Sequence, residues 1–134
     1  MLNTVTRENL QRTLRILAGI SVVLTATALY ILGAQPVAVG LFPSPWDKLA
    51  HLVVFGMLGA AGGVASGTRG WRVVFWCVAS ALLVGIMDEL HQAFLPGRAA
   101  SWSDLAADAA GGMLGAGALE GARRIGAGRF FTHR

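Results

Sequence analysis

Residues 88–108, DELHQAFLPGRAASWSDLAAD, decide the fold, because they end one apolar segment, make a turn and begin the next. Pro96 and Gly97 break any helix that enters the stretch, and Ser101 is a favoured helix N-cap residue. Four of the chain's seven acidic residues lie here: Asp88, Glu89, Asp104 and Asp108. Only 13% of the chain is charged, so this concentration indicates a shared polar site and not an ordinary solvated surface.

The composition places the chain among integral membrane proteins. Of 134 residues, 54% are hydrophobic and 18 are glycine, a balance that suits one membrane domain. A soluble chain of this size would have too little polar surface to cover four long apolar segments. The single Cys77 lies inside an apolar run, so it excludes an internal disulfide and is expected to be a small buried hydrophobe.

Four apolar segments predict an all-α bundle of four transmembrane helices in a single domain. The predicted spans are approximately residues 16–35, 47–65, 71–94 and 102–120. The first segment is near the lower length limit for a span, and we expect it to be an uncleaved helix in preference to a cleaved signal peptide. Proline and glycine residues within 33–45 separate it from the second segment.

Small residues recur at helical spacing in the second and fourth segments. The two stripes consist of Gly56, Gly59, Ala60 and Gly63 in the second segment, and of Ala107, Gly111 and Gly115 in the fourth. Small residues four apart let membrane helices approach each other closely. Both stripes are therefore predicted to pack helix against helix.

Basic residues are distributed unevenly over the two ends of the predicted bundle. With four spans, the amino terminus, the 66–72 turn and the carboxyl-terminal tail share one side, which holds nine of the eleven Lys and Arg residues. Only Lys48 and Arg98 fall on the other side. The positive-inside rule therefore predicts that both termini lie in the cytoplasm. Because the basic balance is a topology signal, nucleic-acid binding is not predicted.

The same topology brings the polar ends of three predicted helices to one level at the outer interface. Ionisable side chains at membrane depth usually face a cavity or one another, so these are predicted to share a site. The candidate ligand-binding residues are Asp47, Lys48, Gln92, Arg98, Asp104 and Asp108, and the candidate catalytic residues are His51, Asp88 and Glu89. For Asp104, in a first helical turn, simple helix capping is an equal alternative.

Two pairings are expected inside this site. His51 is the only histidine within an apolar run, and one of Asp88 and Glu89 is predicted to face it, because adjacent helical residues point about 100° apart. The other is predicted to turn towards Arg98 or a neighbouring helix, and Gln92 could orient either carboxylate. Arg98 is expected to neutralise at least one acid of the cluster, since four acids at one level repel one another.

The order of these motifs resembles the VanZ-like family of small bacterial membrane proteins. The motifs are Asp47-Lys48 with His51, Asp88-Glu89 with Gln92, Pro96-Gly97-Arg98, Asp104, and the stripe from Gly111 to Gly115. They cover residues 46–117, with two departures: Asp108 stands where Asn is expected, and Phe55 where Tyr is common. The resemblance implies a multi-pass protein of the bacterial inner membrane with a role in the cell envelope. It also implies a link to glycopeptide resistance, through the member that named the family.

Three functions fit this site. The first is binding or modification of a cell-envelope or lipid-linked ligand by the outward-facing polar residues, with membrane lipids as further partners. The second is an enzyme in which the carboxylates and His51 act as general acid and base, with or without a hard cation. The sequence has no nucleophile motif and no recognised metal-ligand spacing, so neither a metal nor a cofactor is predicted. The third is transport by a homo-oligomer, because four short spans cannot enclose a path alone.

Overall fold

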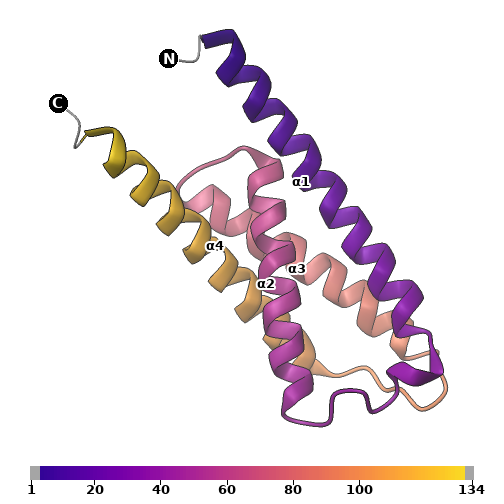
Figure 1. Cartoon of the computed structure of the whole chain (residues 1–134). Coiled ribbons are helices and arrows are strands. Elements are labelled where there is room, and N and C mark those ends of the chain that lie inside the picture. Colours follow the sequence, from indigo (N-terminus) through magenta and orange to yellow (C-terminus); the bar gives the residue numbers. More distant parts are fainter. Residues whose placement is uncertain (1–3, 132–134) are drawn as a thin grey trace.

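A computed structural model describes residues 4–131 of the chain, with side chains described for residues 4–126. This part of the chain consists of α-helices and one short 3₁₀ helix, without a strand. The elements are α1 (Thr4–Gly33), η1 (Pro36–Ala38), α2 (Trp46–Ser66), α3 (Trp71–Gln92) and α4 (Trp102–Phe131) (Figure 1). The predicted all-α class with four helices is confirmed.

Two helices extend well beyond the predicted spans. α1 begins at Thr4 and not near residue 16, and α4 continues to Phe131 and not to residue 120. The apolar pattern marks only the part of a helix that suits lipid, whereas Leu, Arg, Glu and Ala residues outside it keep the backbone helical. α3 ends at Gln92, two residues before the predicted end, and Ala93 is its C-cap.

Three of the helices, α1, α2 and α3, are long and apolar enough to cross a membrane. The protein is therefore an integral membrane protein with several spans. α4 has the same length as α1, 30 residues, but its middle is mostly alanine and glycine and includes Asp108, so it is less apolar. α4 packs along both α2 and α3. A fourth span formed by α4 stays a prediction.

Glycines allow α2 to approach its neighbours with backbone in contact. A Cβ atom on Gly111 of α4 would lie 2.6 Å from the Leu52 carbonyl oxygen, and one on Gly56 would lie 3.2 Å from the Gly111 carbonyl oxygen. Gly59 faces α3 in the same way, since its Cβ atom would lie 2.8 Å from the Cys77 carbonyl oxygen. The predicted packing role of the two small-residue stripes is confirmed. This close approach brings the polar ends of α2, α3 and α4 together.

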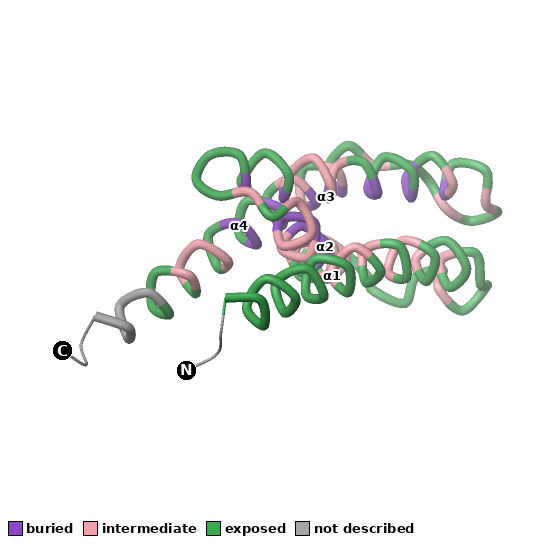
Figure 2. Tube along the Cα trace, turned by 90° about the horizontal axis from the view of Figure 1, so that it is seen from above, coloured by how far each residue is buried: buried purple, intermediate pink, exposed green. Residues whose placement is uncertain are grey.

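α1 lies on the outside of the other three helices. It has no buried residue, whereas α2 and α3 turn buried faces towards the centre (Figure 2). On its inner face, Val22, Ala26 and Leu29 pack against a core cluster that includes Phe55 and Val84. Many of its other apolar side chains are exposed, as expected where a helix faces lipid.

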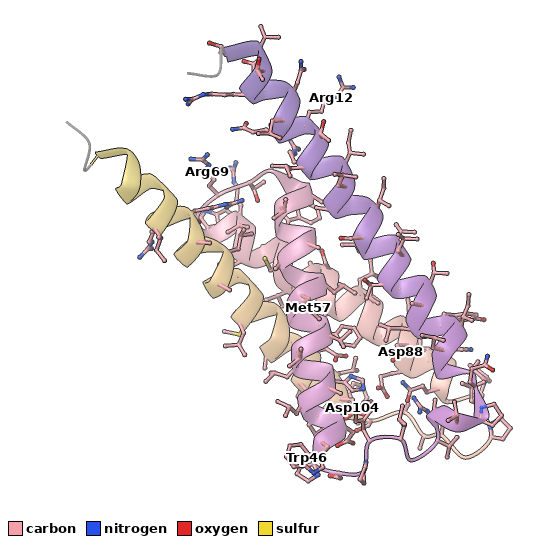
Figure 3. The ribbon with its side chains drawn as sticks, viewed as in Figure 1. Arg12, Trp46, Met57, Arg69, Asp88 and Asp104 are labelled. Atoms are coloured by element: carbon pink, nitrogen blue, oxygen red, sulfur yellow. The ribbon has the colours of Figure 1, made fainter. Side chains whose placement is uncertain are left out.

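The two ends of the bundle differ in their charged groups. At the end where α1 begins, α4 ends and the α2–α3 turn lies (Figure 1), Arg15 and Arg123 donate hydrogen bonds to backbone carbonyls of residues 65–68. Asp88 and Asp104 lie at the opposite end (Figure 3). We call these the basic end and the acidic end. The beginning of α1, the end of α4 and the α2–α3 turn share one side, as predicted; the side that faces the cytoplasm stays a prediction.

Candidate functional site

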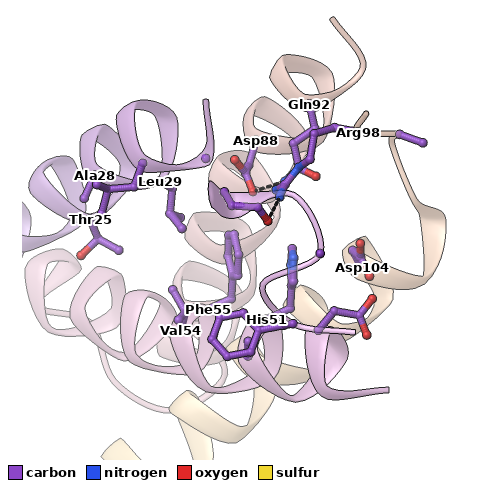
Figure 4. Close-up of a pocket in the computed structure, with 18 of the residues that line it drawn as sticks. Thr25, Ala28, Leu29, His51, Val54, Phe55, Asp88, Gln92, Arg98 and Asp104 are labelled. Atoms are coloured by element: carbon purple, nitrogen blue, oxygen red, sulfur yellow. Dashed lines mark hydrogen bonds between the residues drawn. The ribbon is translucent and has the colours of Figure 1, made fainter. Parts of the chain in front are cut away.

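A cavity of about 410 Å³ lies at the acidic end, between α1, α2, α3 and the loops that join the helices there (Figure 4). It brings together polar residues that are far apart in the sequence. Of the residues predicted for the site, those that line it are Asp47, His51, Asp88, Gln92, Arg98 and Asp104. Its apolar wall includes Ala28, Leu29, Leu32, Val54 and Phe55. The cavity is therefore charged on one side and apolar on the other.

His51 is held by Asp108 of α4. The imidazole Nδ1 and Asp108 Oδ1 are 2.8 Å apart, and Asp108 is completely buried. Gly85 of α3 lies against Asp108, where a Cβ atom would collide with the second carboxylate oxygen. Phe55, one turn after His51, stacks on the imidazole with ring centroids 5.4 Å apart and an interplanar angle of 10°. The imidazole is thus fixed by a carboxylate and by an aromatic ring.

The direct partner of His51 differs from the predicted one. The sequence predicts Asp88 or Glu89 of α3, but Asp108 of α4 binds Nδ1. The glycine contacts explain the difference, because α2 packs most extensively against α4. Glu89 is nevertheless close: one candidate donor atom from each of His51, Glu89 and Asp104 lies within 4.8 Å of the other two.

The adjacent residues Asp88 and Glu89 point in different directions, as their positions on a helix require. Asp88 Oδ2 accepts a hydrogen bond of 2.8 Å from Gln92 Nε2, and Asp88 lines the cavity beside α1. Glu89 Oε2 accepts a hydrogen bond of 2.5 Å from the backbone N–H of Ser101. Only Glu89 belongs to the group around His51, and Gln92 orients Asp88.

Lys48, and not Arg98, neutralises an acid of the cluster. The Lys48 ammonium contacts Oδ1 of Asp104 on α4 and lies 2.7 Å from Oδ2 of Asp47. Arg98 donates through Nη1 to the carbonyl oxygen of Ala38 at 2.8 Å, and it forms no ion pair with any acid among residues 4–126. The prediction for Arg98 is wrong, because the loop that carries this residue lies against η1 and the guanidinium binds a carbonyl there.

The beginning of α4 is also held differently from the prediction. The Ser101 hydroxyl bonds to the Ser103 hydroxyl at 2.7 Å and makes no hydrogen bond to a backbone N–H of the first turn among the described residues. Asp104 pairs with Lys48 of α2, and the Ser101 backbone N–H donates to Glu89 of α3. The predicted side-chain cap is absent because the Ser101 hydroxyl bonds to Ser103 and the Asp104 carboxylate bonds to Lys48, so neither binds a backbone N–H of the first turn.

The contribution of α1 to the cavity is missing from the sequence prediction. Thr25, Ala28 and Leu29 line it, although their segment shows only the uniform apolar pattern of a span. Tyr30, also on α1, stacks on His91 of α3 with ring centroids 3.8 Å apart. Tyr30 is the chain's single tyrosine, and a lone polar aromatic residue on an apolar helix is the signal that could have marked this side of α1.

The charges of the site set the chemistry that it can perform. Its carboxylates are those of Asp47, Asp88, Glu89, Asp104 and Asp108, and its permanent cations are those of Lys48 and Arg98. Carboxylates in excess at membrane depth favour a bound cation or a cationic group of a ligand. The apolar wall beside them suits a hydrocarbon chain.

Comparison with known proteins identifies the family. The chain matches the VanZ/LLP1 family over residues 2–123, a range that includes all the motifs at residues 46–117. Among curated proteins and among solved structures, no significant match to the chain was found. Because the family match extends over most of the chain and contains the polar residues of the cavity, the protein belongs to the VanZ/LLP1 family.

Proposed function

We propose that this protein binds an amphipathic, lipid-linked ligand of the cell envelope in the cavity at its acidic end. The observation that carries the proposal is a single cavity with a charged wall and an apolar wall. The polar head of the ligand would lie near Asp47, His51 and Asp104, and its hydrocarbon chain would lie along α1. Such a ligand stays in the membrane while its head group is bound.

A second, smaller cavity supports this arrangement. Its volume is about 240 Å³, and it lies between α1 and α3 beside Tyr30 and Met87. Leu29 and Asp88 line both cavities, so the apolar space adjoins the charged site. Since α1 has no buried residue, a chain between α1 and α3 would be continuous with the lipid around the protein.

The surplus of carboxylates in the site limits which chemical class of head group it can bind. An amine on the head group would be attracted to them, as in a peptide-like wall precursor, whereas a bare phosphate would be repelled unless a cation came with it. The proposed head group is therefore peptide-like and cationic, or anionic and bound together with a cation.

Binding to the purified protein in lipid nanodiscs tests the proposal. Native mass spectrometry would measure retention of an added lipid-linked wall precursor. We expect saturable binding to the wild type and loss of most binding in Ala28→Trp, because the indole would fill the cavity. The matched control is Ala118→Trp, at an exposed position of α4 that does not line the cavity. Equal binding by both variants would contradict the proposal.

Acid–base catalysis on the bound ligand is the second candidate function, and the His51–Asp108 pair favours it. A buried carboxylate that orients an imidazole is a recurring arrangement in general acid–base catalysis, and Glu89 supplies a second titratable group within 4.8 Å. Turnover of the lipid-linked precursor would be measured in the wild type, His51→Ala and Glu89→Gln. Both variants should lose turnover while still inserting and folding; wild-type protein that binds without turnover would leave binding as the function.

A link to glycopeptide resistance is proposed on the family resemblance alone. Cells that express the wild type should differ in glycopeptide sensitivity from cells that express Ala28→Trp at equal membrane levels. Equal sensitivity would remove this role without affecting the binding measurement.

A further inference from the structure

We propose that His51, Glu89 and Asp104 form a binding site for a divalent metal ion, with one ligand from each of α2, α3 and α4. One candidate ligand atom of each residue lies within 4.8 Å of those of the other two. Ligand atoms about 2.0–2.2 Å from a metal ion lie about 3–4 Å from one another, so small side-chain rotations would complete the site. Because the three ligands come from three helices, no ligand spacing is visible in the sequence.

Glu89 provides an independent observation in favour of a bound cation. Its side chain is only 3% exposed, and Oε2 accepts the hydrogen bond from the Ser101 N–H. Its other oxygen, Oε1, is buried and has no hydrogen-bond partner among the described residues. A buried carboxylate oxygen without a partner is unfavourable. Coordination to a metal ion between Glu89, His51 and Asp104 would satisfy it.

His51 is oriented as a metal ligand. Its Nδ1 lies 2.8 Å from Asp108 Oδ1. An ionised Asp108 can only accept, so it makes Nδ1 the protonated nitrogen and leaves the Nε2 lone pair for a metal ion. Nε2 makes no hydrogen bond within residues 4–126. A carboxylate behind the imidazole is the usual support of a metal-binding histidine, because it fixes the tautomer and the direction of the ring. Asp108 is completely buried, so it holds this orientation without competition from water.

The three ligands favour a transition metal ion. One imidazole nitrogen with two carboxylate oxygens suits Zn²⁺, Mn²⁺ or Fe²⁺, whereas Ca²⁺ and Mg²⁺ prefer oxygen ligands alone. Lys48 contacts Asp104 through Oδ1, which limits the repulsion among the carboxylates before a metal ion binds. Three protein ligands leave at least one coordination position open. His51 and Asp104 line the cavity, so the open position would face it.

An oxygen atom of a phosphate or carboxylate could take this open position, and that extension rests on the proposed ligand binding. Metal binding itself does not. Loss of ligand binding in Ala28→Trp with metal binding retained, or the reverse, would separate the two proposals.

Titration of the full-length, tag-free protein in detergent with Zn²⁺ tests the metal site. Calorimetry should give about one ion per chain for the wild type and affinities at least about tenfold weaker for Glu89→Gln and Asp104→Asn. The matched control is Glu120→Gln, because Glu120 lies at the basic end beside Arg123. No binding by the wild type, or unchanged affinity in Glu89→Gln, would overturn the proposal.

Mn²⁺ electron spin-echo spectroscopy identifies the imidazole ligand. We expect a nitrogen coupling from a directly bound imidazole in the wild type and in His91→Gln, and its disappearance in His51→Gln. A coupling that persists in His51→Gln would overturn the assignment. If His51→Gln fails to fold, the titrations of the near-isosteric Glu89→Gln and Asp104→Asn variants still decide whether the metal site exists.

Discussion

The basic and acidic ends of the bundle contain cavities of equal size but different chemistry. The cavity at the acidic end and the one nearer the basic end each have a volume of about 410 Å³. The polar side chains of the second are hydroxyls: Ser66, Thr68 and Ser80. The first contains carboxylates, an imidazole and a guanidinium from different elements. Cavity volume therefore does not distinguish a candidate site here, whereas the convergence of charged side chains does.

Charged side chains also have different partners at the two ends. At the basic end, Arg15 and Arg123 donate to carbonyls at the end of α2 and in the following turn, where a helix leaves its last carbonyls without intrahelical partners. At the acidic end, Lys48 and His51 contact carboxylates of α4. Charged side chains at the basic end bind the free carbonyls where a helix stops. Those at the acidic end connect α2 to α4 beside a cavity.

The largest loss of stability is expected when the close backbone contact between α2 and α4 is broken. Gly111→Leu should lower the free energy of unfolding by about 3 kcal/mol, because its side chain would collide with the Leu52 carbonyl of α2. Gly117→Leu is the control, since no atom lies within 4 Å of a Cβ atom there. Denaturant unfolding in detergent, followed by circular dichroism, measures both. Equal stabilities would show that α2 and α4 do not depend on this contact.

A smaller loss of stability is expected when a carboxylate is removed from the acidic end. Asp108→Ala should cost about 2 kcal/mol, because it leaves the partly buried His51 Nδ1 without its hydrogen-bond partner. Glu120→Ala, at the basic end, removes a contact of 3.8 Å with Arg123 and an exposed hydrogen bond of 3.1 Å from the Gly70 N–H, and it should cost about 1 kcal/mol. The same unfolding measurement compares them. A larger loss for Glu120→Ala would reverse the contrast between the two ends.

A third comparison removes one arginine from each end: Arg98 at the acidic end and Arg69 at the basic end. Arg98→Ala should cost about 1 kcal/mol more than Arg69→Ala, because Arg98 holds the carbonyl of Ala38, whereas Arg69 is exposed and makes no hydrogen bond within residues 4–126. Thermal unfolding of both variants in detergent tests this. Equal midpoints would mean that the loop contact at the cavity rim contributes nothing to stability.

Topology can be measured with little perturbation of the protein. In a Cys77→Ala background, a membrane-impermeant maleimide added to intact cells should label Ala99→Cys at the acidic end. It should label Arg69→Cys at the basic end only after the cells are permeabilised. This pattern follows from nine basic residues on one side against two on the other, and the opposite pattern would place the acidic end in the cytoplasm.

Several features could be predicted because they depend on local pattern. Apolar length predicts four spans, of which α1, α2 and α3 are long and apolar enough to cross a membrane. The spacing of small residues predicts that the glycine faces of α2 and α4 pack closely against a neighbouring helix. The acids before and after the turn at Pro96 and Gly97 are expected at the same end of the bundle, because a short turn joins the adjoining ends of two antiparallel helices. These inferences need only the helical rise and the side-chain periodicity.

The partners inside the site could not be predicted in this way. Whether His51 meets Glu89 or Asp108 depends on how each helix is rotated about its axis, and Lys48 and Arg98 have side chains long enough to reach several acids. Sequence position also says nothing about how the outer helix α1 would close the cavity with Ala28 and Leu29.

The sequence by itself therefore determined the family, the helices, the separation of charge between the two ends and the residues of the polar cluster. Only the tertiary structure decided that Asp108 holds His51, that Lys48 holds Asp104 and that Glu89 Oε1 is buried without a partner. The physical reason is that helical periodicity acts along one chain segment. Pairing across helices depends on crossing distances, and here glycine contacts between backbones set them.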